Sequence, residues 1–190
     1  GIISGSGQLI KQGSGSLTLS GDNSYTGDTT INGGTLIVSG SLIDSADISI
    51  SSGATYQMGA NDVLASVSGA GTLDLGDYSL TVGDSTNTSL SLLAGTASSV
   101  LTKKGTGTLD LTGTNTFAGK FYLNDGTLFA SNGDLGSSSH IEWNGGALRF
   151  GTTADDGCGG CTLTYIINAG GGTIEVDNAK TIQLSGALTG

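Results

Sequence analysis

The stretch Leu9–Leu36, LIKQGSGSLTLSGDNSYTGDTTINGGTL, is the part of the sequence that decides the fold. It aligns without a gap on Leu101–Leu128, LTKKGTGTLDLTGTNTFAGKFYLNDGTL, so that Leu9 falls on Leu101 and the offset stays constant to the end. Self-similarity of this kind predicts a chain built from stacked copies of one structural unit, because each copy buries its apolar face against the next.

Leucines alternate with hydroxyl side chains inside each copy. In Gly15–Gly21, Leu17 and Leu19 have one parity and the serines and threonine have the other, which is typical of a half-buried β-strand. Glycine, asparagine and aspartate, which favour sharp turns, bracket nearly every such segment. Further apolar pairs are Leu73 and Leu75, Leu80 and Val82, Leu109 and Leu111, Leu148 and Phe150, Ile174 and Val176, and Ile182 and Leu184.

The spacing of equivalent leucines distinguishes between two all-β architectures. The interval from Leu17 to Leu36 is the same as that from Leu109 to Leu128, and Leu148 follows at nearly the same interval again. This interval of about 20 residues is the length of a coil made of short strands and turns. A β-sandwich shows strands roughly every 8 to 12 residues, without a coil period. The sequence therefore predicts a right-handed parallel β-helix over residues 1–190, as a single elongated stack.

Composition excludes several classes of protein. The chain has 190 residues with 35 glycines, no proline and a formal net charge of -10 from six basic and 16 acidic residues. Nucleic-acid binding is not expected, because no basic stripe is available to neutralise a phosphate backbone. No long apolar run or signal peptide is present, so we expect no membrane contact within this segment. The sequence at both ends resembles the middle of a repeat array, so we expect the chain to be a fragment of a longer protein.

The pattern Gly-x-Gly-x-Leu-x-Leu-x-Gly-x-Asn-x-aromatic-x-Gly spans Gly13–Gly27 and Gly105–Gly119. It resembles the passenger-associated transport repeat of autotransporters, and the full internal repeats cover 9–36 and 101–128. We expect its residues to be structural, with the asparagines at corners and the aromatics over one edge of the core. They are Gly13, Gly15, Leu17, Leu19, Gly21, Asn23, Tyr25 and Gly27, and Gly105, Gly107, Leu109, Leu111, Gly113, Asn115, Phe117 and Gly119.

The resemblance implies a Gram-negative autotransporter passenger of the adhesin type, displayed on the cell surface or secreted after export through the periplasm and outer membrane. In such proteins an outer-membrane barrel follows the passenger. The expected function is non-enzymatic adhesion or self-association, with host-cell surfaces or sister molecules as partners, together with a scaffold that supports secretion. Two alternatives are a pure stalk with the activity elsewhere and a carbohydrate-active β-helix enzyme.

Cys158 and Cys161 lie in an expected loop insertion at 151–162, where the interval between Leu148 and Ile174 is longer than one coil. We predict a short-loop disulfide in an oxidising compartment. A thioredoxin-like site would need a surrounding βαβ unit, and a zinc site would need two further ligands, which the chain's single histidine does not supply.

Catalytic chemistry is not expected from the remaining polar residues. Ile141 and Trp143 are spaced to face the core, which leaves His140 facing solvent without a nucleophile elbow nearby. No cofactor or metal is expected. A polysaccharide-cleaving enzyme would use paired carboxylates, and the candidate pairs are Asp155 and Asp156, Asp74 and Asp77, and Glu142 and Glu175.

Overall fold

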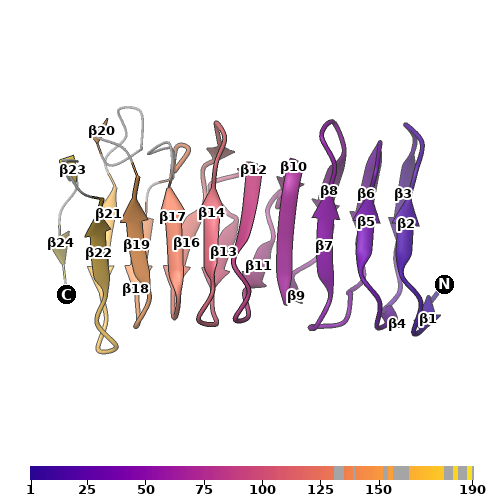
Figure 1. Cartoon of the computed structure of the whole chain (residues 1–190), viewed down its shortest axis with the longest axis horizontal. Coiled ribbons are helices and arrows are strands. Elements are labelled where there is room, and N and C mark those ends of the chain that lie inside the picture. Colours follow the sequence, from indigo (N-terminus) through magenta and orange to yellow (C-terminus); the bar gives the residue numbers. More distant parts are fainter. Residues whose placement is uncertain are drawn as a thin grey trace.

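The computed structural model describes residues 1–130, 135–138, 140–151, 154–155, 163–177, 182–183 and 188–189. Across these ranges every regular element is a β-strand, and no helix long and apolar enough to cross a membrane is present. The strands lie side by side along a rod, with the two chain ends at opposite tips (Figure 1). The prediction of an all-β, elongated solenoid is confirmed.

The largest sheet has 13 parallel strands, and one path of hydrogen-bonded neighbours runs through it along the rod. The path strands are β2 (Leu9–Lys11), β5 (Thr29–Ile31), β7 (Asp47–Ile50), β10 (Ser66–Asp74), β12 (Thr88–Gly95), β14 (Thr108–Leu111), β17 (Thr127–Ala130), β19 (Ala147–Phe150) and β22 (Thr173–Val176). The other members are β3 (Ser16–Leu19), β6 (Thr35–Val38), β8 (Thr55–Met58) and β15 (Thr116–Phe117).

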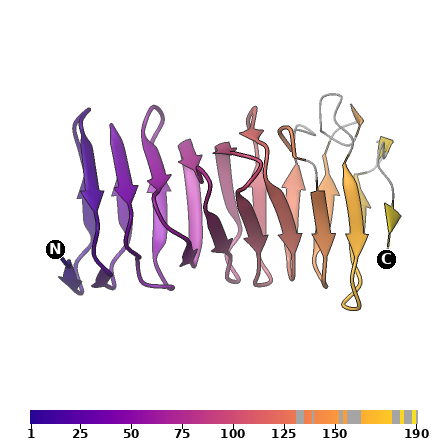
Figure 2. The ribbon, with the colours of Figure 1, turned by 180° about the vertical axis from the view of Figure 1, so that it is seen from behind.

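A seven-stranded parallel sheet covers the opposite side of the rod from Asp62 onward, seen from behind in Figure 2. Its strands are β9 (Asp62–Leu64), β11 (Ser79–Val82), β13 (Val100–Lys103), β16 (Lys120–Leu123), β18 (His140–Trp143), β21 (Thr164–Ile167) and β24 (Leu188–Thr189). Two small sheets pair β1 (Ser4–Gly5) with β4 (Ser24–Tyr25) and β20 (Ala154–Asp155) with β23 (Ile182–Gln183).

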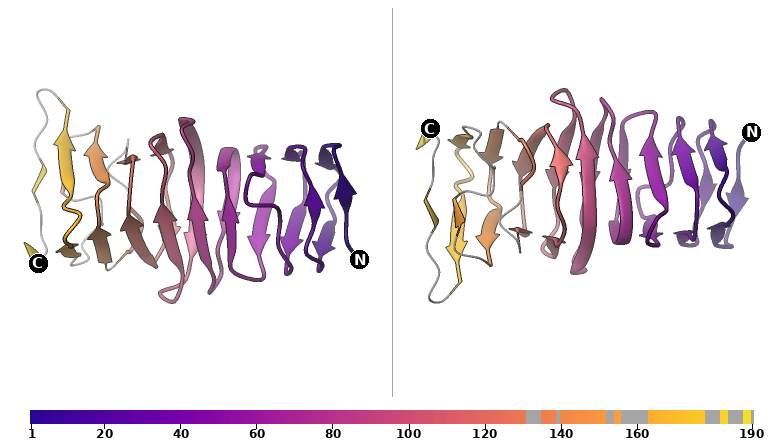
Figure 3. Two further views of the ribbon diagram at one scale, coloured as in Figure 1. Left: turned by 90° about the horizontal axis from the view of Figure 1, so that it is seen from below. Right: turned by 90° about the horizontal axis from the view of Figure 1, so that it is seen from above.

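The strand register confirms the predicted coil period. Leu17 pairs with Leu36, Leu109 with Leu128, and Leu128 with Leu148, as the equal intervals in the sequence indicated. Strands on the near face run upward in Figure 1 and those behind run downward, while the chain advances from right to left, so the coil is right-handed (Figures 1 and 2). Views from below and above show the same single stack (Figure 3).

The core is one column of aliphatic side chains with aromatic residues at intervals. Leu73, Leu80, Leu109 and Leu148 are all buried, as the alternation predicted. Fully burying a leucine contributes about 1.5 to 3 kcal/mol, so the hydrophobic effect accumulates along the stack. Aromatic pairs reinforce it, with Phe117 and Phe121, and Trp143 and Tyr165, having ring centroids 4.7 and 5.8 Å apart.

Three expected core positions are more exposed than the alternation predicts. Leu17 keeps 36% of its surface exposed, whereas its counterpart Leu109 keeps 2%. Ile174 and Val176 keep 37% and 42%. The reason is their place in the sheet, because β3 pairs only with β6 and β22 only with β19, and no described strand covers their other side. The side chains of Ile182 and Leu184 lie outside the described residues.

The two repeats are displaced around the rod by one strand position. β2 lies in the 13-stranded sheet, but β13, its counterpart in the second repeat, lies in the seven-stranded sheet. The first and second halves of β10 and β12 pair with different neighbours, and a register shift falls between Gly69 and Thr72. The offset between the repeats is not a whole number of coils, so equivalent strands cannot stack directly.

Candidate binding surface and the repeat residues beneath it

Repeat glycines allow successive coils to approach each other closely. A Cβ atom on Gly113 would overlap the backbone oxygen of Ser91, and one on Gly107 would overlap that of Thr86. Gly13 and Gly105 instead have positive φ angles of 75° and 67°, which other residues rarely adopt. The second repeat therefore depends on glycine for two reasons, namely close approach and backbone conformation.

The repeat lysines are buried inside the turns. Lys11 and Lys103 keep only 6% and 2% of their surface exposed. The Nζ atom of Lys11 donates to the carbonyl oxygens of Gln12, Gly13 and Gly33 at 3.0, 2.9 and 2.8 Å. Because Gly33 belongs to the next coil, this ammonium group links two coils. Lys103 donates in the same way to the carbonyls that follow it, and burial lowers its pKa against the opposing effect of nearby carboxylates.

The repeat asparagines also join coils, through backbone groups. Oδ1 of Asn23 accepts from the backbone N–H of Ile3 at 2.9 Å, and its Nδ2 donates to the carbonyls of Gly21 and Ser41 at 2.6 and 3.1 Å. Oδ1 of Asn115 accepts from the backbone N–H of a residue in the preceding coil, Leu93, at 2.8 Å. Both side chains are buried. They satisfy buried backbone groups at the corners, a role that only a side chain with both donor and acceptor atoms can fill.

The repeat aromatics Tyr25 and Phe117 are both buried next to these corners. The Tyr25 hydroxyl pairs with Oγ1 of Thr29 at 2.5 Å, and burial raises its pKa. Phe117 has no such polar atom and packs on Phe121. The residues of the repeat motif thus lie in the interior and in the turns. The outer faces of the sheets are formed by other residues.

One outward face carries a row of polar and aromatic side chains in register. We call Ser89, Asp110, Phe129, Arg149 and Glu175 the outer row, since consecutive members occupy paired positions on neighbouring strands. The guanidinium carbon of Arg149 lies 4.8 Å from the ring centroid of Phe129. Arg149 also forms an ion pair with Asp177 at 2.8 Å, which raises its pKa. Arg149 is therefore held in place by Phe129 on one side and by Asp177 on the other.

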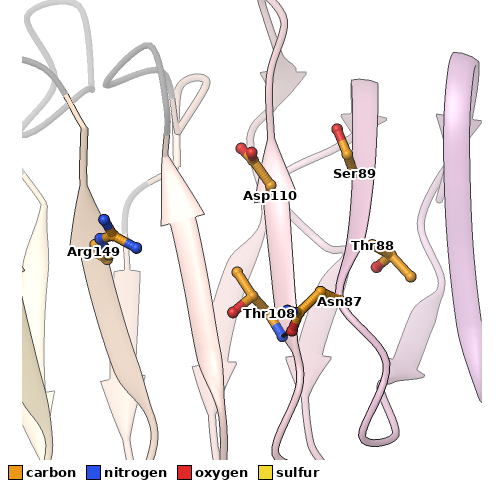
Figure 4. A pocket seen from close by; sticks show the side chains of 6 residues that line it. All are labelled: Asn87, Thr88, Ser89, Thr108, Asp110 and Arg149. Carbon is orange, nitrogen blue, oxygen red and sulfur yellow. Dashed lines mark hydrogen bonds between the residues drawn. The ribbon is translucent and has the colours of Figure 1, made fainter.

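A shallow polar cleft of about 340 Å³ opens on this face (Figure 4). It lies over β12, β14 and β19, and its wall contains one carboxylate and one guanidinium among hydroxyl and amide groups. The residues that line it are Asn87, Thr88, Ser89, Thr108, Asp110 and Arg149.

The seven-stranded sheet presents a second polar group, centred on His140 and Glu142. Nε2 of His140 lies 3.1 Å from Oε2 of Glu142, and Nδ2 of Asn168 donates to Oε1 of Glu142 at 2.5 Å. Ile141 and Trp143 face the core as predicted. His140 lies on the outward side of β18 as expected, but its side chain is only 16% exposed and its ring centroid lies 6.0 Å from that of Tyr122.

Glu142 should make the stability of this face sensitive to acid. The hydrogen bond from Asn168 and then that from His140 lower its pKa below the ordinary 4.5. A carboxylate with a lowered folded-state pKa stabilises the fold above its unfolded value, and this contribution is lost as the pH falls through the folded value. We expect Glu142→Gln to remove that part of the acid sensitivity, measured as the free energy of unfolding between pH 6 and pH 3, roughly the carboxylate range. An unchanged pH profile would contradict the assignment.

The described members of the candidate acidic pairs accept local hydrogen bonds or lie on separate sheets. Oδ1 of Asp74 accepts from the backbone N–H of Gly76 at 3.0 Å, and Oδ1 of Asp77 accepts from Oγ1 of Thr96 at 2.6 Å. Glu142 and Glu175 lie on different sheets. In the ranges that the structure describes, no group of three or more His, Cys, Asp or Glu residues is arranged to hold a metal ion.

The predicted disulfide and one acidic pair are not placed by the structure. Cys158, Cys161 and Asp156 lie outside the described residues, as do the side chain of Asp155 and most of the insertion at 151–162. The register pairs Leu148 with Ile174, so one coil is longer here than its neighbours, as the spacing indicated. The disulfide stays a prediction.

Sequence reasoning missed the residues that define the cleft and the role of the repeat lysines. The cleft brings Asn87 and Arg149 together from distant parts of the sequence, and no motif marks either one. A signal did exist for the lysines: Lys11 and Lys103 recur at the same parity as Leu9 and Leu101, which assigns them to the inner face of the strand.

The passenger-associated transport repeat family matches the chain at residues 9–38 and 101–128. Two copies of that repeat within a right-handed parallel β-solenoid are features that the chain shares with autotransporter passengers, and this similarity supports a location at the cell surface or secretion.

Over 117 residues the chain is 41% identical to the adhesin BmaC autotransporter of Brucella suis biovar 1 (strain 1330). The alignment covers 57% of this chain and 3% of that relative, so the chain spans a small part of the length of the relative. No solved structure matches the chain.

Proposed function

We propose that this segment is a non-enzymatic part of a surface passenger that acts in adhesion or self-association, with host-cell surfaces or sister passengers as partners. The observation that supports this best is the outer row, in which Asp110, Phe129 and Arg149 lie in register on a fixed β-face. The relative named an adhesin supports the same function. A repeated display on a rigid rod suits a surface that binds through many weak contacts.

The energetics of such a surface favour multivalent binding. A single hydrogen bond contributes about 0.5 to 1.5 kcal/mol net, so one copy of the face would bind weakly. Many copies on one cell raise the effective concentration of binding sites, and the avidity rises with it. The proposed partners are therefore surfaces with repeated groups.

The same segment is also proposed to act as a scaffold that supports secretion. Each finished coil presents unpaired strand edges on which the next coil can form, so folding can propagate from one end of the stack. The inward position of Lys103, Asn115 and Phe117 supports this role. The inward position of these residues supports a pure stalk equally well. The two functions differ because a pure stalk would bind nothing through its outer faces.

Surface display tests adhesion against the stalk. Cells that display the passenger should clump or adhere to host cells, and deletion of residues 1–190 should reduce this several-fold at equal display. The double variant Phe129→Ser with Arg149→Ser should weaken adhesion while the passenger stays displayed, because it alters only outward positions. Thr102→Ser, on the seven-stranded sheet, is the matched control. Undiminished clumping after deletion would overturn the adhesive function and favour the stalk.

A further inference from the structure

The cleft over β12, β14 and β19 is lined by residues that keep polar groups unpaired with protein, although Asn87 and Arg149 each also have a protein partner. Oδ1 of Asn87 accepts from the backbone N–H of Thr108 at 2.8 Å, which fixes the amide and leaves its Nδ2 hydrogens available. In the part of the chain that the structure describes, the hydroxyl groups of Thr88, Ser89 and Thr108 form no hydrogen bond with protein. The cleft therefore offers an amide donor and three hydroxyl groups that both donate and accept.

Asp110 has a buried acceptor with nothing bound to it. Its Oδ1 atom is inaccessible to solvent and, among the described residues, has no hydrogen-bond partner. Buried polar atoms are nearly always paired, and an exception calls for an explanation. Asp110 forms part of the wall of the cleft, so a ligand donor can approach its carboxylate from that side.

Arg149 supplies a fixed donor on the other side of the cleft. Its Nε and one terminal nitrogen both lie 2.8 Å from Oδ1 of Asp177, and the guanidinium packs over Phe129. A side chain held in this way loses little conformational entropy on binding a ligand. Figure 4 shows the guanidinium of Arg149 on β19 and the carboxylate of Asp110 on β14, with β17 between the two strands.

We propose that this cleft binds a neutral, hydroxyl-rich saccharide. The inference rests on the proposed adhesive function and names its ligand class. Hydroxyl, amide and carboxylate groups match the alternating donors and acceptors of a sugar ring, and one basic side chain against a net charge of -10 disfavours a polyanion. The cleft is of the size that small-molecule sites have, about 300 to 1,000 Å³.

Nuclear magnetic resonance titration of the 190-residue chain tests the proposal. The probes are neutral tetrasaccharides of glucose, galactose, mannose and N-acetylglucosamine, a sulfated tetrasaccharide and a lysine-rich peptide. At least one neutral sugar should cause saturable shifts at the amides of 87–89 and 108–110 and at the Asn87 side-chain amide. Asp110→Asn and Arg149→Ala should each weaken that binding at least tenfold, by about the energy of one charged hydrogen bond.

Asp28→Asn is the matched control, since it removes the same charge at an exposed position far along the chain, and it should bind like the parent. Binding of only the sulfated sugar or only the peptide would overturn the saccharide assignment, as would no binding at all. Adhesion that persists in cells displaying Asp110→Asn, with no neutral sugar bound by the purified chain, removes the cleft proposal and leaves the adhesive function standing. If cells that display the unaltered passenger do not adhere, and the unaltered purified chain binds no neutral sugar, the adhesive function itself is removed.

Discussion

Replacing Gly107 by alanine is expected to lower the free energy of unfolding by about 3 kcal/mol, the upper part of the range for overpacked positions. The new Cβ atom would overlap the carbonyl oxygen of Thr86 and lie 2.7 Å from its carbonyl carbon. Both contacts are to backbone, so no side chain can turn aside, and the turn must lift off the coil beneath it. Urea unfolding followed by circular dichroism measures the loss.

Gly15 provides a matched control within the same chain. It occupies the position of Gly107 in the first repeat, and a Cβ atom built on it meets nothing within 4 Å. Neither glycine has a positive φ angle, so backbone strain does not separate them. Gly15→Ala should change stability by no more than about 0.5 kcal/mol. Equal losses for the two variants would show that close packing between coils does not explain the repeat glycine.

The coil and its core could be predicted from the sequence because they depend on local periodicity. Alternation decides which side of a strand faces inward, and the interval from Leu109 to Leu128 decides which residues stack. Some expected core positions are more exposed than predicted, for a physical reason that the alternation of residues does not reveal. Leu17 has the same parity as Leu109 but lies on a strand covered on one side only.

The candidate site could not be predicted in the same way, because it depends on which outward residues share a face. Asp110 and Arg149 lie on strands separated by β17, and their register depends on every turn between them. The displacement of the second repeat around the rod also moves its outward residues to a different face from those of the first repeat. The similarity of the two repeat motifs therefore does not predict which outward residues lie next to each repeat on the surface.

Lys103→Met is expected to lower the free energy of unfolding at neutral pH by about 2 to 4 kcal/mol. Methionine matches the length of the buried stem but leaves the carbonyls of Lys104 and Gly105 without the donor that now lies 2.5 and 2.8 Å away. Lys120→Met is the control, because Lys120 is exposed on the same seven-stranded sheet and its loss should cost about 0.5 kcal/mol or less. Similar losses for the two variants would contradict a specific role for the buried ammonium group.

The pH dependence of the same pair of proteins identifies the ammonium group directly. Burial lowers the folded-state pKa of Lys103 below its ordinary value of 10.5, so between the two values the unfolded chain holds the proton more tightly. The contribution of this group to stability therefore increases as the pH rises through that interval. The Met variant lacks the group, so the stability difference between parent and variant should widen from neutral pH toward pH 10, roughly the ordinary lysine range. A difference that stays constant would mean that the fold does not lower the pKa of Lys103, and a difference that narrows would mean that the fold raises it.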